Sequence, residues 1–318
     1  MPTRLLRHHE IDLAAWDACV GAARQVVPYA CSWWLQATAG RWDAVVELEE
    51  SSGRYLSVWP LPVKWRPWGR EIHQPPFTQQ LGWLASTNAK QPLGSGGLMN
   101  LDSLLAHYSR CYTQLNEANE LPPQAPLPVA FQQRHTYQLR LDSPYETLRG
   151  AYAADYRRRL RLYEAAGRPL RVTETTNVEP LLQLFQQTKG PEAGLKTRHY
   201  ILMRKLVAAL SLRQLLDIRE VREPQTGELL ASALFVRYRT KLVYLFAAAS
   251  LAGKKAGAPL LLLDAVIQQH AGTSELVLDF EGGTIPSIAR FFANFGAEPV
   301  PYAALSFTQR PWYLKWMR

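Results

Sequence analysis

The stretch LLASALFVRYRTKLVYLFAAASLAGKKAGAPLLLLDAVIQQH, residues 229–270, decides the fold class of this chain. It opens with two apolar segments, 229–238 and 241–250, whose β-branched and aromatic residues and short polar connection predict antiparallel strands. A glycine-containing loop, 253–258, follows, and Pro259 then stands at the first position of an apolar helix, where a missing N–H is tolerated. This order predicts a sheet with a helix packed against it.

The flanking segments extend the same pattern. We expect a long helix at 145–166, a strand at 170–175, helices at 178–187 and 199–210, strands at 215–221 and 275–280, and a helix at 286–296. Helices mixed with antiparallel strands predict an α+β fold with a mixed central sheet.

A proline-rich segment divides the chain. Residues 116–128 contain four prolines and no apolar periodicity, so they continue neither a helix nor a central strand. A helix start is expected after Asp142, where a capping serine precedes a proline. We therefore predict two domains, 1–142 and 143–318, which agrees with a length of 318 residues.

In the first domain, Asp12 is expected to cap a helix that runs to Val20, and Ser32 to cap a second helix. Strands are expected at 44–48 and 55–64. Eight of the ten tryptophans lie in this domain, and we interpret most of them as core residues.

Composition points to a folded protein of the cytoplasm. Three cysteines are too few for a disulfide framework, and the opening residues MPTRLLRHHEID lack the apolar core of a signal peptide. The longest apolar stretch, 242–253, is shorter than the roughly 20 residues of a transmembrane helix. The sequence leaves the oligomeric state open, with a monomer as the simpler expectation.

The positive charge is concentrated in the second domain. Residues 1–142 hold 12 basic and 12 acidic side chains, whereas residues 143–318 hold 24 and 15, which accounts for the whole net charge of +9. Such an excess suggests an anionic partner, a phosphorylated cofactor or RNA, although it also serves solubility. No paired cysteine or histidine motif, nucleophile elbow, phosphate-binding loop or dinucleotide fingerprint is visible, so no metal is expected.

Several motifs together resemble the GNAT acyltransferase superfamily. The run KKAGAP at 254–259 is similar to the GNAT loop that opens a helix and holds the pyrophosphate of acyl-CoA, except that Pro259 lacks an N–H. QPPFTQQLG at 74–82, DYRRRL at 155–160 and LDFEGG at 278–283 resemble the FemAB-like branch. That resemblance implies two tandem GNAT-like domains with mixed central sheets, and transfer of an aminoacyl group from aminoacyl-tRNA to an amine of a peptidoglycan precursor.

The resemblance also implies roles for individual residues. Glu281, just past the strand at 275–280, is the candidate base for the attacking amine, with a turn-forming or capping role as the alternative. Tyr244 and Tyr302 are candidate proton donors to the leaving group, with core packing as the alternative. The candidate donor-binding residues are Gly253, Lys254, Lys255, Gly257, Ala258 and Arg159. The candidate substrate-binding residues are Gln79, Lys196, Arg198 and Asp279.

Two functions fit these features. The first is an acyl- or aminoacyltransferase that uses acyl-CoA or aminoacyl-tRNA as donor and a small-molecule or peptidoglycan-precursor amine as acceptor. The family-typical tRNA donor is put slightly ahead of CoA, although no long two-helix arm for tRNA is evident. The second is a non-catalytic GNAT-fold protein that binds RNA or a phosphorylated ligand.

Overall fold

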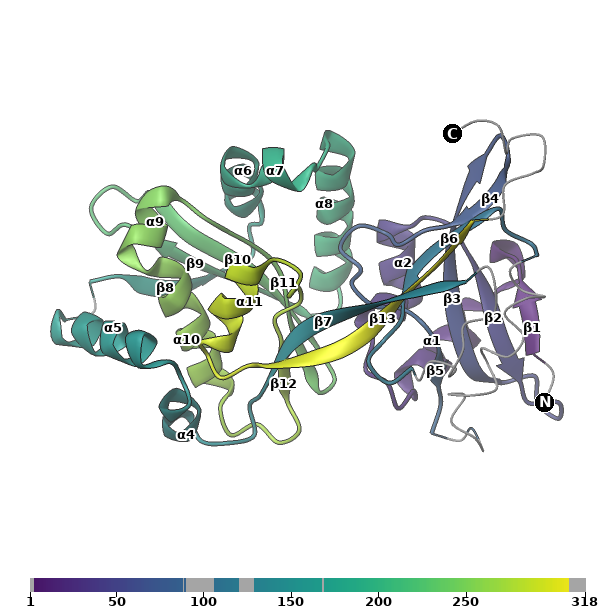
Figure 1. Ribbon diagram of the computed structural model, residues 1–318, viewed down its shortest axis with the longest axis horizontal. Coiled ribbons are helices and arrows are strands. Elements are labelled where there is room, and N and C mark those ends of the chain that lie inside the picture. Colours follow the sequence, from purple (N-terminus) through teal and green to yellow (C-terminus); the bar gives the residue numbers. More distant parts are fainter. Residues whose placement is uncertain (1–2, 88, 90–105, 120–128, 168, 309–318) are drawn as a thin grey trace. The chain divides into compact units, whose positions relative to one another are not determined.

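Figure 1 shows the computed structural model of the chain, which describes residues 3–87, 89, 106–119, 129–167 and 169–308. The chain forms two compact units. Unit 1 comprises residues 1–134 and 301–318, and unit 2 comprises residues 135–300. Within the described ranges, no helix is long and apolar enough to cross a membrane.

The division between the units lies inside strands. Strand β7 (Ala130–Arg140) begins in unit 1 and continues in unit 2, and β13 (Glu298–Thr308) leads back to unit 1. The boundary therefore falls at 134/135 and not at residue 142, because the end of β7 pairs with a strand of unit 2. The proline-rich residues 120–128 and the last residues, 309–318, lie outside the described residues.

Unit 1 is an α+β unit whose strand order is β1-β2-β3-β4-β6-β13, with β5 paired to β3. Its elements besides β13 are β1 (Thr3–Leu6), η1 (His8–Glu10), α1 (Leu13–Gly21), η2 (Pro28–Ala30), α2 (Ser32–Thr38), β2 (Trp42–Leu48), β3 (Tyr55–Arg66), β4 (Gly69–Ile72), β5 (Leu84–Ala85) and β6 (Arg110–Gln114). Asp12 caps α1 as predicted, accepting the N–H groups of Ala14 and Ala15. Ser32 is the first residue of α2 and not its cap, because its hydroxyl donates to Asp17.

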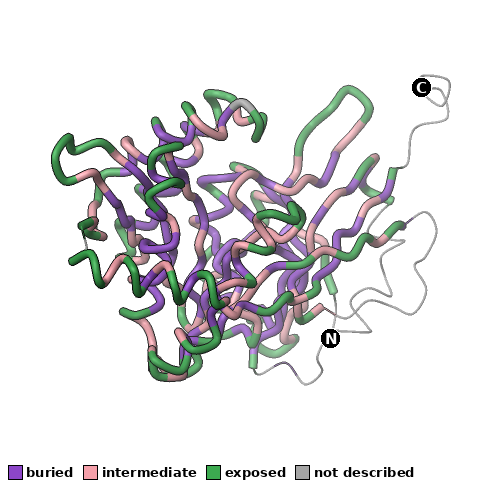
Figure 2. Tube along the Cα trace, turned by 60° about the vertical axis from the view of Figure 1, so that its left-hand side comes forward, coloured by how far each residue is buried: buried purple, intermediate pink, exposed green. Residues whose placement is uncertain are grey.

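Unit 2 holds the segment from which the fold was predicted. Its sheet has the order β7-β12-β11-β10-β9-β8, antiparallel except for the parallel pair β11–β12. Its remaining elements are α4 (Tyr145–Gly150), α5 (Ala154–Ala165), β8 (Arg171–Thr175), α6 (Glu179–Thr188), α7 (Gly190–Ala193), α8 (Thr197–Ser211), β9 (Leu216–Arg222), β10 (Leu229–Tyr238), β11 (Lys241–Ala249), α9 (Leu251–Ala256), α10 (Ala258–His270), β12 (Val277–Asp279) and α11 (Pro286–Ala293). Figure 2 shows that buried residues follow the strands, while connecting segments are mostly exposed.

The predicted helix at 145–166 is two helices, α4 and α5. The chain breaks between them because Tyr152 turns into the core, where its ring meets that of Phe295 edge-on at 5.2 Å. The N–H of Ala153 donates to the carbonyl of Asn294 at 2.8 Å. Contact with the end of α11 therefore interrupts a sequence whose periodicity alone favours one helix.

The predicted loop at 253–258 is mostly the short helix α9. Ser250 caps it by accepting the N–H of Gly253, and Gly257, at φ +77°, separates it from α10. Gly253 lies directly on β10, because a Cβ at this position would stand 1.9 Å from the carbonyl oxygen of Leu230. A glycine is therefore required here by packing.

Replacing Gly253 with alanine should destabilise unit 2 by about 2 kcal/mol, because α9 must move off β10 to accommodate the added methyl group. Chemical denaturation followed by far-ultraviolet circular dichroism, which reports on the helices of unit 2, measures the change. Gly150→Ala is the matched control, since a Cβ there meets nothing within 4 Å. Equal stabilities of the two variants would contradict the packing role.

Candidate functional site

The parallel strands β11 and β12 separate at one end of their pairing. Three residues of β12 pair with β11, the last pair being Asp279 with Val243. Strand β11 then continues to Ala249, whereas β12 ends. The pairing of β11 and β12 thus ends at Asp279; this end of the pairing, here called the opening, lies two residues before Glu281.

Asp279 connects the segments that meet at this opening. Its side chain is buried, accepts hydrogen bonds from Thr136 at 2.5 Å and Gln138 at 3.1 Å, and forms an ion pair with Lys241 at 3.4 Å. It also accepts the backbone N–H of Glu281 at 3.0 Å. Its oxygens are thus engaged inside the protein, which favours a positioning role over the predicted contact with substrate.

Glu281 lies in a turn of left-handed backbone. Its φ is +48°, and those of Gly282 and Gly283 are +71° and +144°. A Cβ at Gly283 would stand 2.8 Å from the carbonyl oxygen of His135, so both space and conformation require glycine. A non-glycine residue at positive φ carries strain, which the bond from its N–H to Asp279 offsets. The turn holds the half-buried Glu281 beside the opening.

The two predicted tyrosines lie in different units. Tyr244 on β11 packs against the rings of Phe235, Phe280 and Phe292 at centroid distances of 5.3, 6.3 and 6.0 Å. Burial raises the pKa of this phenol, so it stays protonated and is able to donate. Tyr302 belongs to unit 1, where its hydroxyl donates to Gln114 at 3.0 Å.

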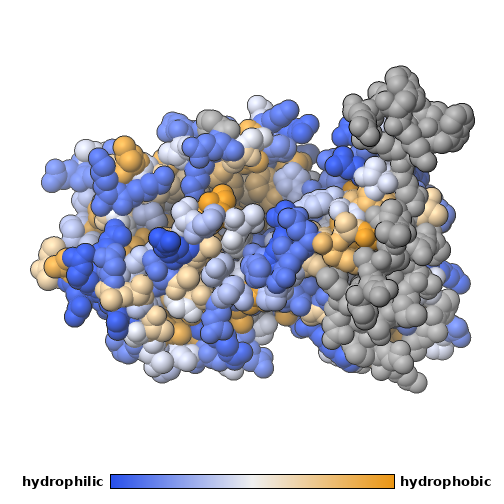
Figure 3. All heavy atoms as spheres, viewed as in Figure 1, coloured by the Kyte–Doolittle hydropathy of each residue, from blue (hydrophilic) through white to orange (hydrophobic). Residues whose placement is uncertain are grey.

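Positive charge gathers at the N-terminus of α10. A guanidinium nitrogen of Arg159 lies 3.0 Å from the position of a Cβ on Gly257, so α5 places this arginine directly over the first turn of α10. Asp155 pairs with Arg158 at 2.9 Å, and no described acidic side chain pairs with Arg159. Hydrophilic side chains gather over the end of unit 2 that carries α5 (Figure 3).

Two lysines add to this charge. Lys254 is exposed in the last turn of α9, three residues before Gly257. The second is Lys189, which follows α6. Burial and the neighbouring charge of Lys254 lower the pKa of Lys189. Lys189 was not among the predicted donor-binding residues, since it lies 65 positions before Lys254 and only the tertiary fold joins them.

The first turn of α10 supplies backbone donors as well. The N–H of Ala258 has no acceptor within its own helix, as in any first turn, whereas Pro259 has no N–H to offer. This arrangement of free donors, positive helix end and cations is suited to a phosphate. Lys255 is exposed on α9, while Gly253 serves packing.

The remaining predicted residues lie elsewhere. Lys196 and Arg198 are exposed where α8 begins, and the backbone N–H of Lys196 donates to the ring of His199 at 3.0 Å. Gln79 lies in unit 1, and its side-chain oxygen is buried with no hydrogen-bond partner in the described part of the chain. Among those same residues, no group of three or more His, Cys, Asp or Glu side chains is suited to hold a metal ion.

Comparison with known proteins identifies a family that unit 2 matches. Residues 150–286, all in unit 2, match the family described as Acetyltransferase (GNAT) domain. No curated protein matches the chain.

Solved structures share the fold of both units at low sequence identity. The structure of FemX is 13% identical with a TM-score of 0.65, and covers 95% of this chain and 97% of its own. A tandem GNAT protein from the clavulanic acid biosynthesis pathway is 13% identical with a TM-score of 0.54, covering 98% and 99%. The C-terminal domain of a lysylphosphatidylglycerol synthetase homologue from Agrobacterium fabrum is 11% identical with a TM-score of 0.54, covering 94% and 92%. Unit 2 therefore contains a GNAT domain, and the chain as a whole has the fold of FemX and of the tandem GNAT protein.

Proposed function

We propose that unit 2 transfers an acyl group from acyl-CoA to an amine. The placement of Arg159 over the first turn of α10 carries this proposal, because it pairs a free cation with a helix N-terminus. The match of residues 150–286 to an acetyltransferase domain supports the same donor.

The donor would place its pyrophosphate at Gly257 and Ala258. Arg159 and Lys254 would neutralise its charge, and the absence of a side chain at Gly257 would let the phosphate approach the backbone. Lys189 would add charge from the end of α6, since a bound anion opposes the lowering of its pKa by burial and Lys254. These interactions bind and orient the donor without taking part in the bond change.

The reaction would occur where β11 and β12 separate. The acceptor amine gives a proton to Glu281, directly or through a water, and its nitrogen attacks the thioester carbonyl. As the tetrahedral intermediate collapses, the carbon–sulfur bond breaks and Tyr244 gives its proton to the leaving thiolate. The acceptor class is an amine of a small molecule or a peptidoglycan precursor, and Lys196 and Arg198 remain proposed contacts for it.

Two alternatives are tested by the same measurements. Aminoacyl-tRNA in place of acyl-CoA would engage many phosphates of its backbone. A binding protein without catalysis is favoured by Pro259, which removes one backbone donor from the phosphate site.

Replacing Arg159 with alanine should weaken acetyl-CoA binding about 10-fold, because it removes a charge-assisted hydrogen bond. Isothermal titration calorimetry at several salt concentrations measures the affinity. Arg161→Ala, on the same helix but exposed, is the matched control and should change the affinity less than about 2-fold. Failure to bind acetyl-CoA, together with binding of charged tRNA that falls steeply with salt, would replace the CoA proposal by the tRNA one.

Replacing Glu281 with glutamine should slow acyl transfer by about 100-fold or more, because the turn is kept while the proton acceptor is lost. Steady-state rates with a panel of amines and acetyl-CoA measure the effect. Glu228→Gln, an exposed change in the turn before β10, is the control. Acetyl-CoA binding should be unchanged in both variants. Transfer by the glutamine variant at the wild-type rate would assign Glu281 to the turn alone.

A further inference from the structure

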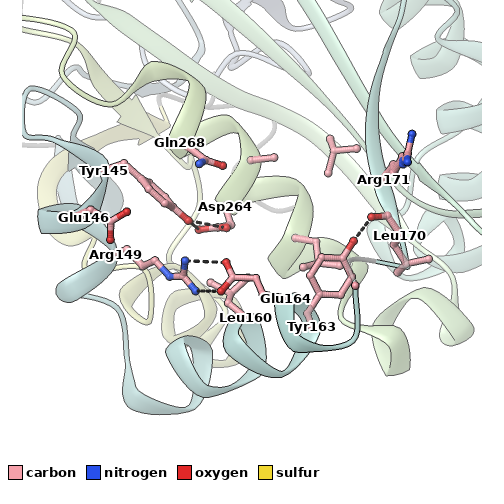
Figure 4. A pocket seen from close by; sticks show the side chains of 14 residues that line it. Tyr145, Glu146, Arg149, Leu160, Tyr163, Glu164, Leu170, Arg171, Asp264 and Gln268 are labelled. Atoms are coloured by element: carbon pink, nitrogen blue, oxygen red, sulfur yellow. Dashed lines mark hydrogen bonds and ion pairs between the residues drawn. The ribbon is translucent and has the colours of Figure 1, made fainter.

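Unit 2 contains a pocket to which the proposed transfer site contributes no residue. It has a volume of about 590 Å³ and lies among α4, α5, β8 and α10 (Figure 4). Its lining residues are Tyr145, Glu146, Arg149, Leu160, Tyr163, Glu164, Gly167, Leu170, Arg171, Val172, Leu261, Asp264, Ala265 and Gln268.

A buried carboxylate faces this pocket. Asp264 is 9% exposed, and both of its oxygens accept from the single hydroxyl of Tyr145 at 2.9 Å. One proton shared by two oxygens leaves most of their accepting capacity unused. The phenol of Tyr152, 2% exposed, is a second hydroxyl beside this carboxylate. Burial, followed by the charge of Asp264, raises the pKa of the Tyr152 phenol.

The neighbouring arginine is hydrogen-bonded to Glu164 and not to Asp264. Both terminal nitrogens of Arg149 bind the two oxygens of Glu164, at 2.8 and 3.0 Å. Figure 4 shows this pair beside the Tyr145–Asp264 hydrogen bond, with Arg171 on the far side of the pocket. Burial accordingly raises the pKa of Asp264, although the bond from Tyr145 opposes the shift. A ligand that brings a positive charge would supply the missing partner.

The lining decides which kind of cation fits. Three carboxylates line the pocket, but Glu164 is paired with Arg149 and Glu146 is exposed, so Asp264 is the buried carboxylate offered to a cation. The faces of Tyr145 and Tyr163 attract such a cation. Leucines at 160, 170 and 261 offer apolar contact for a short hydrocarbon chain.

We infer that this pocket binds a small primary amine, with its ammonium group on Asp264 and its hydrocarbon chain against Tyr163 and the leucines. Binding at this position requires no acyl transfer, so it stands or fails independently of the proposed function.

The test uses n-pentylamine as the probe and n-pentanol as its uncharged counterpart, titrated calorimetrically into the full chain at neutral pH. We expect the amine to bind at least about 10-fold more tightly than the alcohol, because only the amine meets the carboxylate with a charge. Asp264→Asn should weaken amine binding by a similar factor. Ala265→Phe should abolish binding of both probes by filling the pocket, without changing its charge.

Glu192→Gln, an exposed change on α7, is the control and should bind both probes as the wild type does. If thermal melting shows that Asp264→Asn does not fold, Ala265→Phe and the preference for amine over alcohol decide the matter. Equal affinity for the two probes, no amine binding, or amine binding that persists in folded Asp264→Asn or Ala265→Phe would overturn the inference.

Discussion

The carboxylate of Asp279 joins three strands and a turn. It binds Thr136 and Gln138 from β7, Lys241 from β11 and the backbone of Glu281, all from its own position at the end of β12. Removing one partner of such a buried pair costs about 3–5 kcal/mol, because the remaining charge is left without compensation. The place where β11 and β12 separate, and with it the position of Glu281, therefore depends on this one side chain.

Two glycines determine how α9 and α10 of unit 2 are placed. Gly257 ends α9 and begins α10 within one residue, and Gly253 lets α9 lie directly on β10. Both glycines face the backbone or side chains of neighbouring elements, so the proposed phosphate-binding site and a packing requirement share the same few residues. The consequence is that mutations in this segment change stability as well as binding, and Arg159 gives a cleaner test of the donor site.

The two polar sites of unit 2 differ in how their charge is balanced. At Asp279, a lysine and neutral donors satisfy the carboxylate. At Asp264, the neighbouring arginine is paired with Glu164, and the carboxylate accepts from the phenol of Tyr145. A satisfied buried carboxylate organises structure, whereas one lacking a counter-charge beside a cavity is suited to a ligand.

Local sequence patterns were sufficient for the fold class, most elements of unit 2 and the glycine-containing segment before α10, because alternation, capping residues and turn residues act within a few positions. They failed where distant contacts compete with local preference. Tyr152 breaks the predicted long helix by packing on Phe295, and residues 253–256 form a helix because β10 supports them. The partners that engage Asp279, Thr136 and Lys241, were not predicted because they are far from it in sequence. The proximity of Arg159 to Gly257, and the pocket around Asp264, likewise depend on how α5 packs against α10, which only the tertiary structure decides.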